Sequence, residues 1–194
     1  MAIEVPSHLL SYEDYAAIDD GRHYQVLDGE LIMSPSPSTR HQFAGLEIAT
    51  ALHLYARAQG GRAFIAPMDV VLRAERPAVI LQPDVLYVRP ERRAIVTKPN
   101  IQGPPDLVVE ILSPSNARLD TVRKKALYAR YAVPELWIVS DEQDQLEVYR
   151  LGPDGAYGRP ELYLPGDRLE SPLLPNFTLD VAAIFPPEDE PGPG

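Results

Sequence analysis

The stretch Pro104-Pro105-Asp106-Leu107-Val108-Val109-Glu110-Ile111-Leu112 decides the fold predicted for this chain. Its apolar residues fall on both alternating faces, as in a strand that is covered on both sides. Glu110 interrupts the run, and an unpartnered carboxylate there would cost several kcal/mol or remain protonated. Glu110 therefore needs a cation, a strong hydrogen-bond donor or a neighbouring base. A buried ion pair with Arg118 or Arg123 is the structural alternative to a metal site.

A second acid heads the preceding apolar run, Pro83-Asp84-Val85-Leu86-Tyr87-Val88. A single Pro-Asp pair more often opens a strand or caps a turn than binds a ligand. Two carboxylates on one face of directly paired strands, however, can share one divalent ion, whose charge keeps both ionised despite burial. We therefore expect the strands of Asp84 and Glu110 to be neighbours and both side chains to be metal ligands.

Local signals on either side of these runs predict further strands and helices. Helices are expected over about residues 11–19, 40–59 and 118–131, and strands over residues 24–27, 30–33, 64–65, 68–72, 135–139 and 146–151. Asp28-Gly29 is the residue pair of a tight hairpin turn. The long middle helix is expected to end at Gly60-Gly61 and to bury Leu46, Ala49, Leu52 and Ala56. This order of elements predicts an α/β fold, a mixed β-sheet flanked by helices.

Composition narrows the class of protein. The chain has 194 residues, 45% of them hydrophobic, which suits one domain over residues 1–185. Residues 186–194, with Glu188-Asp189-Glu190 between prolines and glycines, are predicted to be a disordered acidic tail. The formal charge of −10 argues against a general cationic surface for nucleic acid, and the absence of cysteine excludes disulfides and thiolate chemistry. The N-terminus lacks a signal pattern and no run of residues is long and apolar enough for a membrane span, so we expect a cytoplasmic protein without membrane contact.

Several motifs follow one another between about residues 24 and 185. They are Asp28-Gly29-Glu30-Leu31, Ser34-Pro35-Ser36-Pro37 followed by His41, Pro83-Asp84-Val85, Val109-Glu110-Ile111-Leu112-Ser113-Pro114-Ser115, Lys124 four residues before Tyr128, and Val133-Pro134-Glu135-Leu136-Trp137. With these motifs the chain resembles the Uma2 family of restriction-endonuclease-like proteins, which is placed in the PD-(D/E)XK nuclease superfamily. The resemblance implies a central mixed sheet flanked by helices and hydrolysis of DNA phosphodiesters that depends on Mg²⁺ or Mn²⁺. Asp84 and Glu110 would be the catalytic metal ligands.

The catalytic lysine is the point at which the chain departs from the superfamily pattern of an acid, any residue and a lysine on one strand. Leu112 stands where that lysine would be, and the matching residue of the family is Lys124, on the following helix. The periodicity of apolar residues on this helix favours Lys125 instead. If the apolar stripe is Leu119, Val122, Ala126 and Ala129, then at ~100° per residue Lys125 lies nearer its edge than Lys124. A second, mostly aromatic face contains Lys124, Leu127, Tyr128 and Tyr131, so the choice between the two lysines stays open, with Lys124 preferred.

Other residues complete the predicted site. His41 would contact phosphate or water in the pocket, or else be an ordinary helix-start histidine, and Glu30 would add an acid to the metal pocket or pair across the hairpin. Basic residues gather between positions 118 and 130 in an otherwise acidic chain, and a DNA backbone could lie along them: Arg118, Arg123, Lys125 and Arg130. Charge runs of this kind are also common on solvated helix faces, and so small a patch would bind DNA weakly.

The sequence thus predicts a metal-dependent endonuclease, with two alternatives. The fold could serve as a catalytically inert interaction module, or the site could hydrolyse smaller phosphoesters. Because one small basic patch holds duplex DNA poorly, we expect a homodimer or a higher homo-oligomer, which would also bring two active sites to two strands. The strand pair over residues 135–151 is the candidate edge for this association.

Overall fold

The computed structural model of the protein describes residues 9–34, 36–112 and 117–185, with side chains from residue 121 onward in the last range. The predicted tail over residues 186–194 and the end of the Val109–Ser115 motif, residues 113–115, lie outside the described residues. Among the residues that are described, no helix is both long enough and apolar enough to cross a membrane.

Two sheets form most of the molecule. In spatial order, the six-stranded sheet consists of β11 (Glu161–Tyr163), β10 (Gln145–Arg150), β9 (Glu135–Ser140), β8 (Leu107–Leu112), β6 (Val85–Val88) and β3 (Arg62–Ile65). The five-stranded sheet consists of β2 (Glu30–Met33), β1 (Tyr24–Leu27), β5 (Val79–Leu81), β4 (Val70–Arg73) and β7 (Ile101–Gln102). A separate hairpin pairs β12 (Arg168–Ser171) with β13 (Leu174–Asp180). Parallel pairing of β8 with β9 and antiparallel pairing of β8 with β6 make the larger sheet mixed, as predicted.

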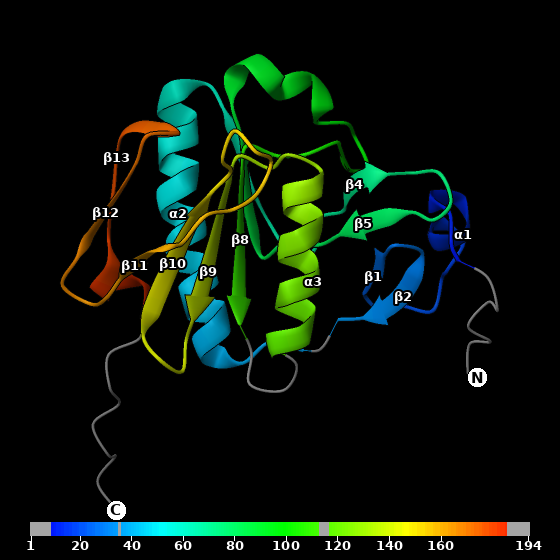
Figure 1. Ribbon diagram of the computed structural model, residues 1–194, viewed down its shortest axis with the longest axis horizontal. Coiled ribbons are helices and arrows are strands. Elements are labelled where there is room, and N and C mark those ends of the chain that lie inside the picture. Colours follow the sequence, from blue (N-terminus) through cyan, green and yellow to red (C-terminus); the bar gives the residue numbers. More distant parts are fainter. Residues whose placement is uncertain (1–8, 35, 113–116, 186–194) are drawn as a thin grey trace, which may run out of the picture.

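The larger sheet is covered on both faces, which explains why β8 is apolar on both alternations. Helix α2 (Thr39–Gln59) and the β12–β13 hairpin cover one face, in a core that contains Val109 and Trp137. Helix α3 (Ala117–Arg130) and residues of the five-stranded sheet cover the other face, in a core that contains Val108 and Tyr128. Figure 1 shows β8 and β9 between these two helices. Helix α3 connects the parallel strands β8 and β9, as a crossover helix does.

The local signals near the N-terminus gave correct elements. Ser11 caps α1 (Tyr12–Ala16) in a reciprocal capping box with Asp14, although the helix ends three residues before the predicted position. The β1–β2 hairpin turns at Asp28 and Gly29, whose φ angles of 49° and 86° are both positive. Two consecutive positive φ angles are what a tight turn between twisted strands requires.

The prediction for α2 was right in extent and partly wrong in its buried face. The helix ends at Gly60, which adopts a left-handed conformation with φ of 81°. Its buried residues are Ala44, Gly45, Ile48, Leu52 and Ala56. Leu46, which was predicted to be buried, is 58% exposed because the stripe follows the four-residue spacing of Ile48, Leu52 and Ala56, and Leu46 lies well away from it around the helix.

The strand pair over residues 135–151 is not a sheet edge. β9 lies between β8 and β10, and β10 pairs on its other side with β11. The edges of the larger sheet, among the described residues, are β3 and β11. The predicted association edge is therefore wrong, because the short strand β11, which was not predicted, follows β10 in the chain and pairs with its outer side.

We expect Gly61→Ala to destabilise the protein by about 1–3 kcal/mol, the cost typical of adding atoms to a packed region. A Cβ atom at Gly61 would lie 2.7 Å from the Tyr87 ring and 2.8 Å from the backbone oxygen of Val88, which cannot move independently of β6. Urea unfolding measures the change. Gly158→Ala is the matched control, since its Cβ would meet no atom within 4 Å. Equal stability of both variants would contradict this description of the α2–β3 connection.

Candidate active site

The register of two strands brings the predicted acids together. β6 and β8 pair directly and antiparallel, with Val85 opposite Val109. Continuing this register by one residue places Asp84 opposite Glu110, on the same face of the sheet. Both side chains line one pocket, of about 420 Å³. The prediction that the two acid-bearing strands are neighbours is therefore confirmed.

Asp84 is held by donors from two elements. Its Oδ2 accepts a hydrogen bond from the backbone nitrogen of Ile111 at 2.7 Å, and its Oδ1 lies 3.0 Å from Nε2 of His41. His41 reaches this position from the first turn of α2, which Ser38 caps. Burial lowers the pKa of the His41 imidazole, but the hydrogen bond and the charge of Asp84 outweigh this effect, so the pKa is raised overall. A protonated His41 would fix the orientation of the Asp84 carboxylate.

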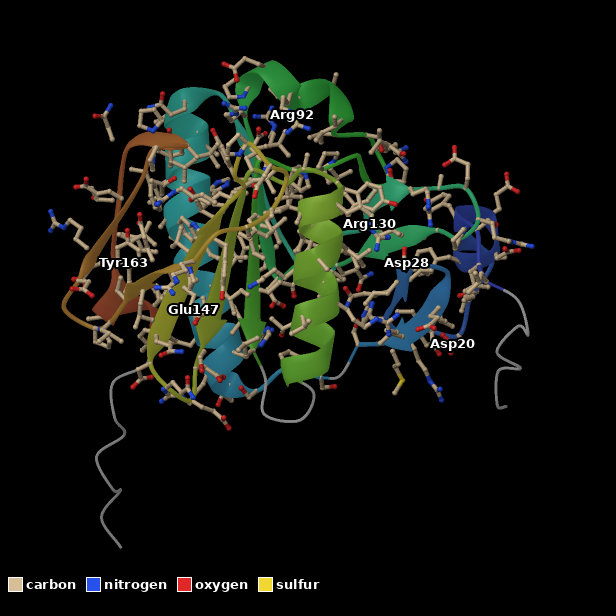
Figure 2. The ribbon with its side chains drawn as sticks, in the orientation of Figure 1. Asp20, Asp28, Arg92, Arg130, Glu147 and Tyr163 are labelled. Atoms are coloured by element: carbon tan, nitrogen blue, oxygen red, sulfur yellow. The ribbon has the colours of Figure 1, made fainter. Side chains whose placement is uncertain are left out.

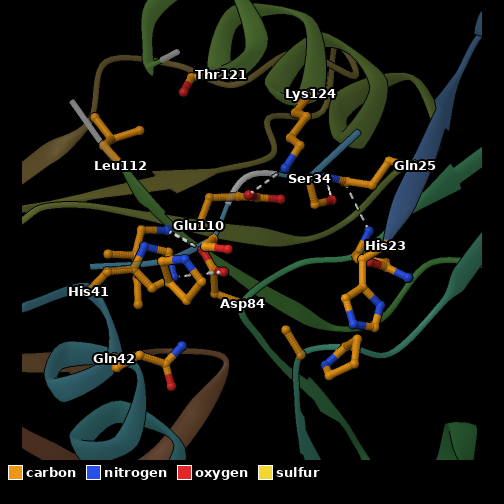
Figure 3. Close-up of a pocket in the computed structure, with 16 residues that line it drawn as sticks. His23, Gln25, Ser34, His41, Gln42, Asp84, Glu110, Leu112, Thr121 and Lys124 are labelled. Carbon is orange, nitrogen blue, oxygen red and sulfur yellow. Dashed lines mark hydrogen bonds and ion pairs between the residues drawn. The ribbon is translucent and has the colours of Figure 1, made fainter. Parts of the chain in front are cut away.

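Glu110 is 8% exposed, and two side chains of α3 donate hydrogen bonds to its carboxylate. Nζ of Lys124 donates to its Oε2 at 2.8 Å, and the Tyr128 hydroxyl donates to its Oε1 at 2.5 Å. Burial raises the pKa of Glu110, Lys124 lowers it and the negative charge of Asp84 raises it, with a net increase. Figure 3 shows Lys124 descending from α3 to Glu110, with Asp84 and His41 on the opposite side of that carboxylate. Among the described side chains, the strong donors that Glu110 was expected to need are Lys124 and Tyr128, whereas Arg123 pairs with Glu30.

The structure distinguishes the two lysines. Lys124 is buried and lines the pocket, whereas Nζ of Lys125 lies 3.9 Å from the centre of the Tyr149 ring. The apolar stripe proposed from periodicity is wrong, because Val122 is 65% exposed and Ala126 is also exposed. Helix α3 instead buries Lys124, Leu127 and Tyr128. The Lys124 ammonium and the Tyr128 hydroxyl donate to Glu110, and the Leu127 side chain and the Tyr128 ring pack in the core.

Of the remaining predicted residues, Glu30, Arg123 and Arg130 lie apart from the pocket. Glu30 forms an exposed ion pair with Arg123 at 2.7 Å and does not line the pocket. Arg130, at the end of α3, pairs with Asp28 of the β1–β2 turn at 2.7 Å, and Figure 2 shows these two side chains next to each other. The side chain of Arg118 lies outside the described residues. The basic patch predicted along α3 is therefore neutralised in part by the carboxylates of the neighbouring hairpin.

Sequence reasoning missed several residues of the site. Tyr128 was predicted to share a helix face with Lys124, but its hydrogen bond to Glu110 was not predicted. The pocket wall also includes polar residues to which no role had been assigned, namely His23, Gln25, Gln42 and Gln82. No local pattern signals these residues, because the first two come from the five-stranded sheet and its preceding loop, far from β8 in sequence.

The donor set fits a hard divalent cation that keeps part of its water. The described residues contain no group of three or more His, Asp or Glu side chains that could hold a metal ion. Asp84 and Glu110 offer carboxylate oxygens that each accept one protein hydrogen bond and retain a further lone pair. Two carboxylates suffice for Mg²⁺ when water and substrate oxygens complete the coordination.

We expect Lys124→Met to lower the free energy of unfolding by about 3 kcal/mol, because it leaves the buried Glu110 carboxylate without its cationic partner. Adding Glu110→Gln should recover part of this loss, so the two changes should not be additive. Urea unfolding of the two single variants and the double variant measures the coupling. Lys125→Met is the control, with an expected loss below about 1 kcal/mol. Additive losses at Lys124 and Glu110 would contradict the direct interaction.

Comparison with known proteins agrees with this geometry. The family model Uma2, described as putative restriction endonuclease, matches residues 10–182. A crystal structure described as a putative nuclease belonging to DUF820, from Anabaena variabilis ATCC 29413, is similar with a TM-score of 0.75 and 16% sequence identity, over 91% of this chain and 97% of that chain. At this identity the likeness shows the fold alone. No curated protein matches the sequence. Since the family model covers all the elements that build the pocket, the chain belongs to the Uma2 family.

Proposed function

We propose that this protein hydrolyses phosphodiester bonds of DNA with the help of Mg²⁺ or Mn²⁺. The observation that carries the proposal is the meeting of Asp84, Glu110 and Lys124 in one pocket, from three different elements. A structural ion pair would explain Glu110 and Lys124 alone. It would not explain a second carboxylate opposite Glu110, whose charge makes ionisation of Glu110 less favourable.

Two carboxylates that line one pocket, one of them buried, favour a cation between them. Asp84 and Glu110 would hold it, and His41 and Tyr128 would keep the two carboxylates oriented. A bound divalent cation would act as a Lewis acid toward the phosphate and lower the pKa of a coordinated water. The family description "putative restriction endonuclease" supports a nuclease function for the chain, and the facing positions of Asp84 and Glu110 support them as the metal ligands.

Lys124 has a separate task in the proposed reaction. Its ammonium group lies in the pocket beside Glu110 and can donate hydrogen bonds in three directions. One of these can orient the water whose oxygen attacks phosphorus, or stabilise negative charge on the phosphate oxygens as the P–O bond breaks. The burial of Lys124 strengthens this interaction, because fewer water molecules compete for its charge.

Metal binding should depend on both acids. We expect Mg²⁺ or Mn²⁺ to bind the parent protein in isothermal titration calorimetry, and Asp84→Asn and Glu110→Gln each to weaken binding by at least ~10-fold, the scale on which a lost ligand or its support acts. Glu30→Gln is the control, because Glu30 lies outside the pocket. Unchanged binding in both pocket variants would remove the shared metal site.

The rate of DNA cleavage should depend on Lys124 and not on Lys125. We expect Lys124→Met to reduce the Mg²⁺-dependent cleavage rate of DNA by ~10²-fold or more while metal binding is retained, the effect typical of removing one positioned charge or acid–base group. Lys125→Met should cleave at nearly the parent rate, because Lys125 faces Tyr149 rather than the pocket.

The same assay distinguishes the alternatives. Cleavage of bis(4-nitrophenyl) phosphate without cleavage of any DNA would favour a hydrolase of smaller phosphoesters. Failure to cleave either substrate with Mg²⁺ or Mn²⁺, together with unimpaired metal binding, would favour an inert interaction module.

A further inference from the structure

Among the described side chains, the basic groups of α3 nearest the pocket already interact with carboxylates. Within the described part of the chain, Lys124 is the one lysine or arginine that lines the pocket, and it donates to Glu110. Two arginines of α3 pair with carboxylates: Arg123 with Glu30 and Arg130 with Asp28. Proteins that hold duplex DNA do so mainly by neutralising phosphates with several basic side chains. The described surface beside this site, in a chain of formal charge −10, is poorly suited to that mode of binding.

Hydrogen-bonding side chains other than lysine and arginine line the pocket instead. Figure 3 shows Gln25, Ser34 and His23 on one side of the Asp84 and Glu110 carboxylates, and Gln42 on another. The Gln25 amide is fixed, since its Oε1 accepts from the Gln82 backbone nitrogen at 3.0 Å and its Nε2 donates to Ser34 at 3.3 Å. Amide side chains carry a donor and an acceptor side by side, which is the pattern presented by the edges of nucleobases.

Apolar groups complete the wall and the surrounding surface. Side chains without polar atoms line the pocket between the polar ones: Pro37, Ala66, Pro67, Ile111 and Leu112. Three large exposed apolar residues are chain neighbours of pocket-lining residues, namely Met33 (57% exposed), Ile65 (47%) and Val122 (65%). Flat apolar contacts of this kind suit the faces of nucleobases, which are available only where bases are unstacked.

We propose that the pocket binds an unpaired nucleobase beside the scissile phosphate, so that single-stranded DNA is the preferred substrate. The inference rests on the proposed nuclease function and names the substrate class of the same site. The volume of about 420 Å³ lies within the range of pockets that enclose small organic groups. A paired base would first have to leave the duplex, at the cost of its pairing and stacking.

Binding without metal tests the pocket independently of catalysis. Fluorescence anisotropy in EDTA would compare three fluorescein-labelled probes: a mixed-sequence single strand, the duplex of that strand, and a single strand with abasic sites in place of its central bases. We expect the intact single strand to bind at least ~10-fold more tightly than either of the others, the scale expected when base stacking contributes. Binding of the single strand should also weaken only slightly with added salt, because few phosphates are neutralised.

Variants of the exposed apolar residues that adjoin pocket-lining residues in the chain show whether the preference arises at this pocket. Met33→Ser combined with Val122→Ser should reduce affinity for the intact single strand several-fold and leave the abasic strand unaffected. Leu54→Ser is the matched control, since Leu54 is 60% exposed on α2 and does not line the pocket. With Mg²⁺ present, the parent protein should cleave the single strand ~10-fold or more faster than the duplex.

Each outcome bears on one proposal. Equal binding of single strand, duplex and abasic strand, with equal cleavage of the first two, would overturn the nucleobase pocket and leave the nuclease function standing. Selective binding of the intact single strand with no cleavage under Mg²⁺ or Mn²⁺ would support the pocket and overturn the nuclease function. An equal loss of affinity in Leu54→Ser and in the double variant Met33→Ser with Val122→Ser would also overturn the assignment to this pocket.

Discussion

The site depends on a carboxylate inside a sheet that is covered on both faces. Glu110 stands in β8, where its neighbours Val109 and Ile111 belong to the core under α2. A charge in this position is stable only if donors reach it from the layer above, and Lys124 and Tyr128 do so from α3. The contact between Glu110 and these two side chains therefore fixes which face of α3 is buried, and with it the position of every pocket residue that α3 provides.

Much of the fold could be predicted because its signals are local. The two acid-bearing strands, the Asp28-Gly29 turn and the ends of α2 each follow from a few consecutive residues. The buried faces of the helices were less predictable. Val122 is exposed and Lys124 is buried because the Glu110 carboxylate on β8 outweighs the apolar periodicity of α3, and no window of sequence around α3 contains Glu110.

The candidate site residues also differ in whether the structure brings them to the pocket. Asp84, Glu110, Lys124 and His41 were named from motifs, and the structure brings all four to one pocket. Glu30 and Arg123 were also named, but they meet each other at the surface instead. A charge pattern on one helix cannot reveal this, because the carboxylates that pair with Arg123 and Arg130 belong to a hairpin about a hundred residues earlier in the chain.

The position of the lysine on a helix has a structural consequence for the strand. A lysine two residues after Glu110 would lie on the same face of β8 as the acid, at the position that Leu112 occupies. With the lysine on α3, Leu112 can instead line the pocket as an apolar residue. The ammonium group then reaches Glu110 only while α3 remains packed on β8 through Leu127 and Tyr128. The proposed chemistry of this pocket and the stability of the α3–β8 interface are therefore linked through the same side chains.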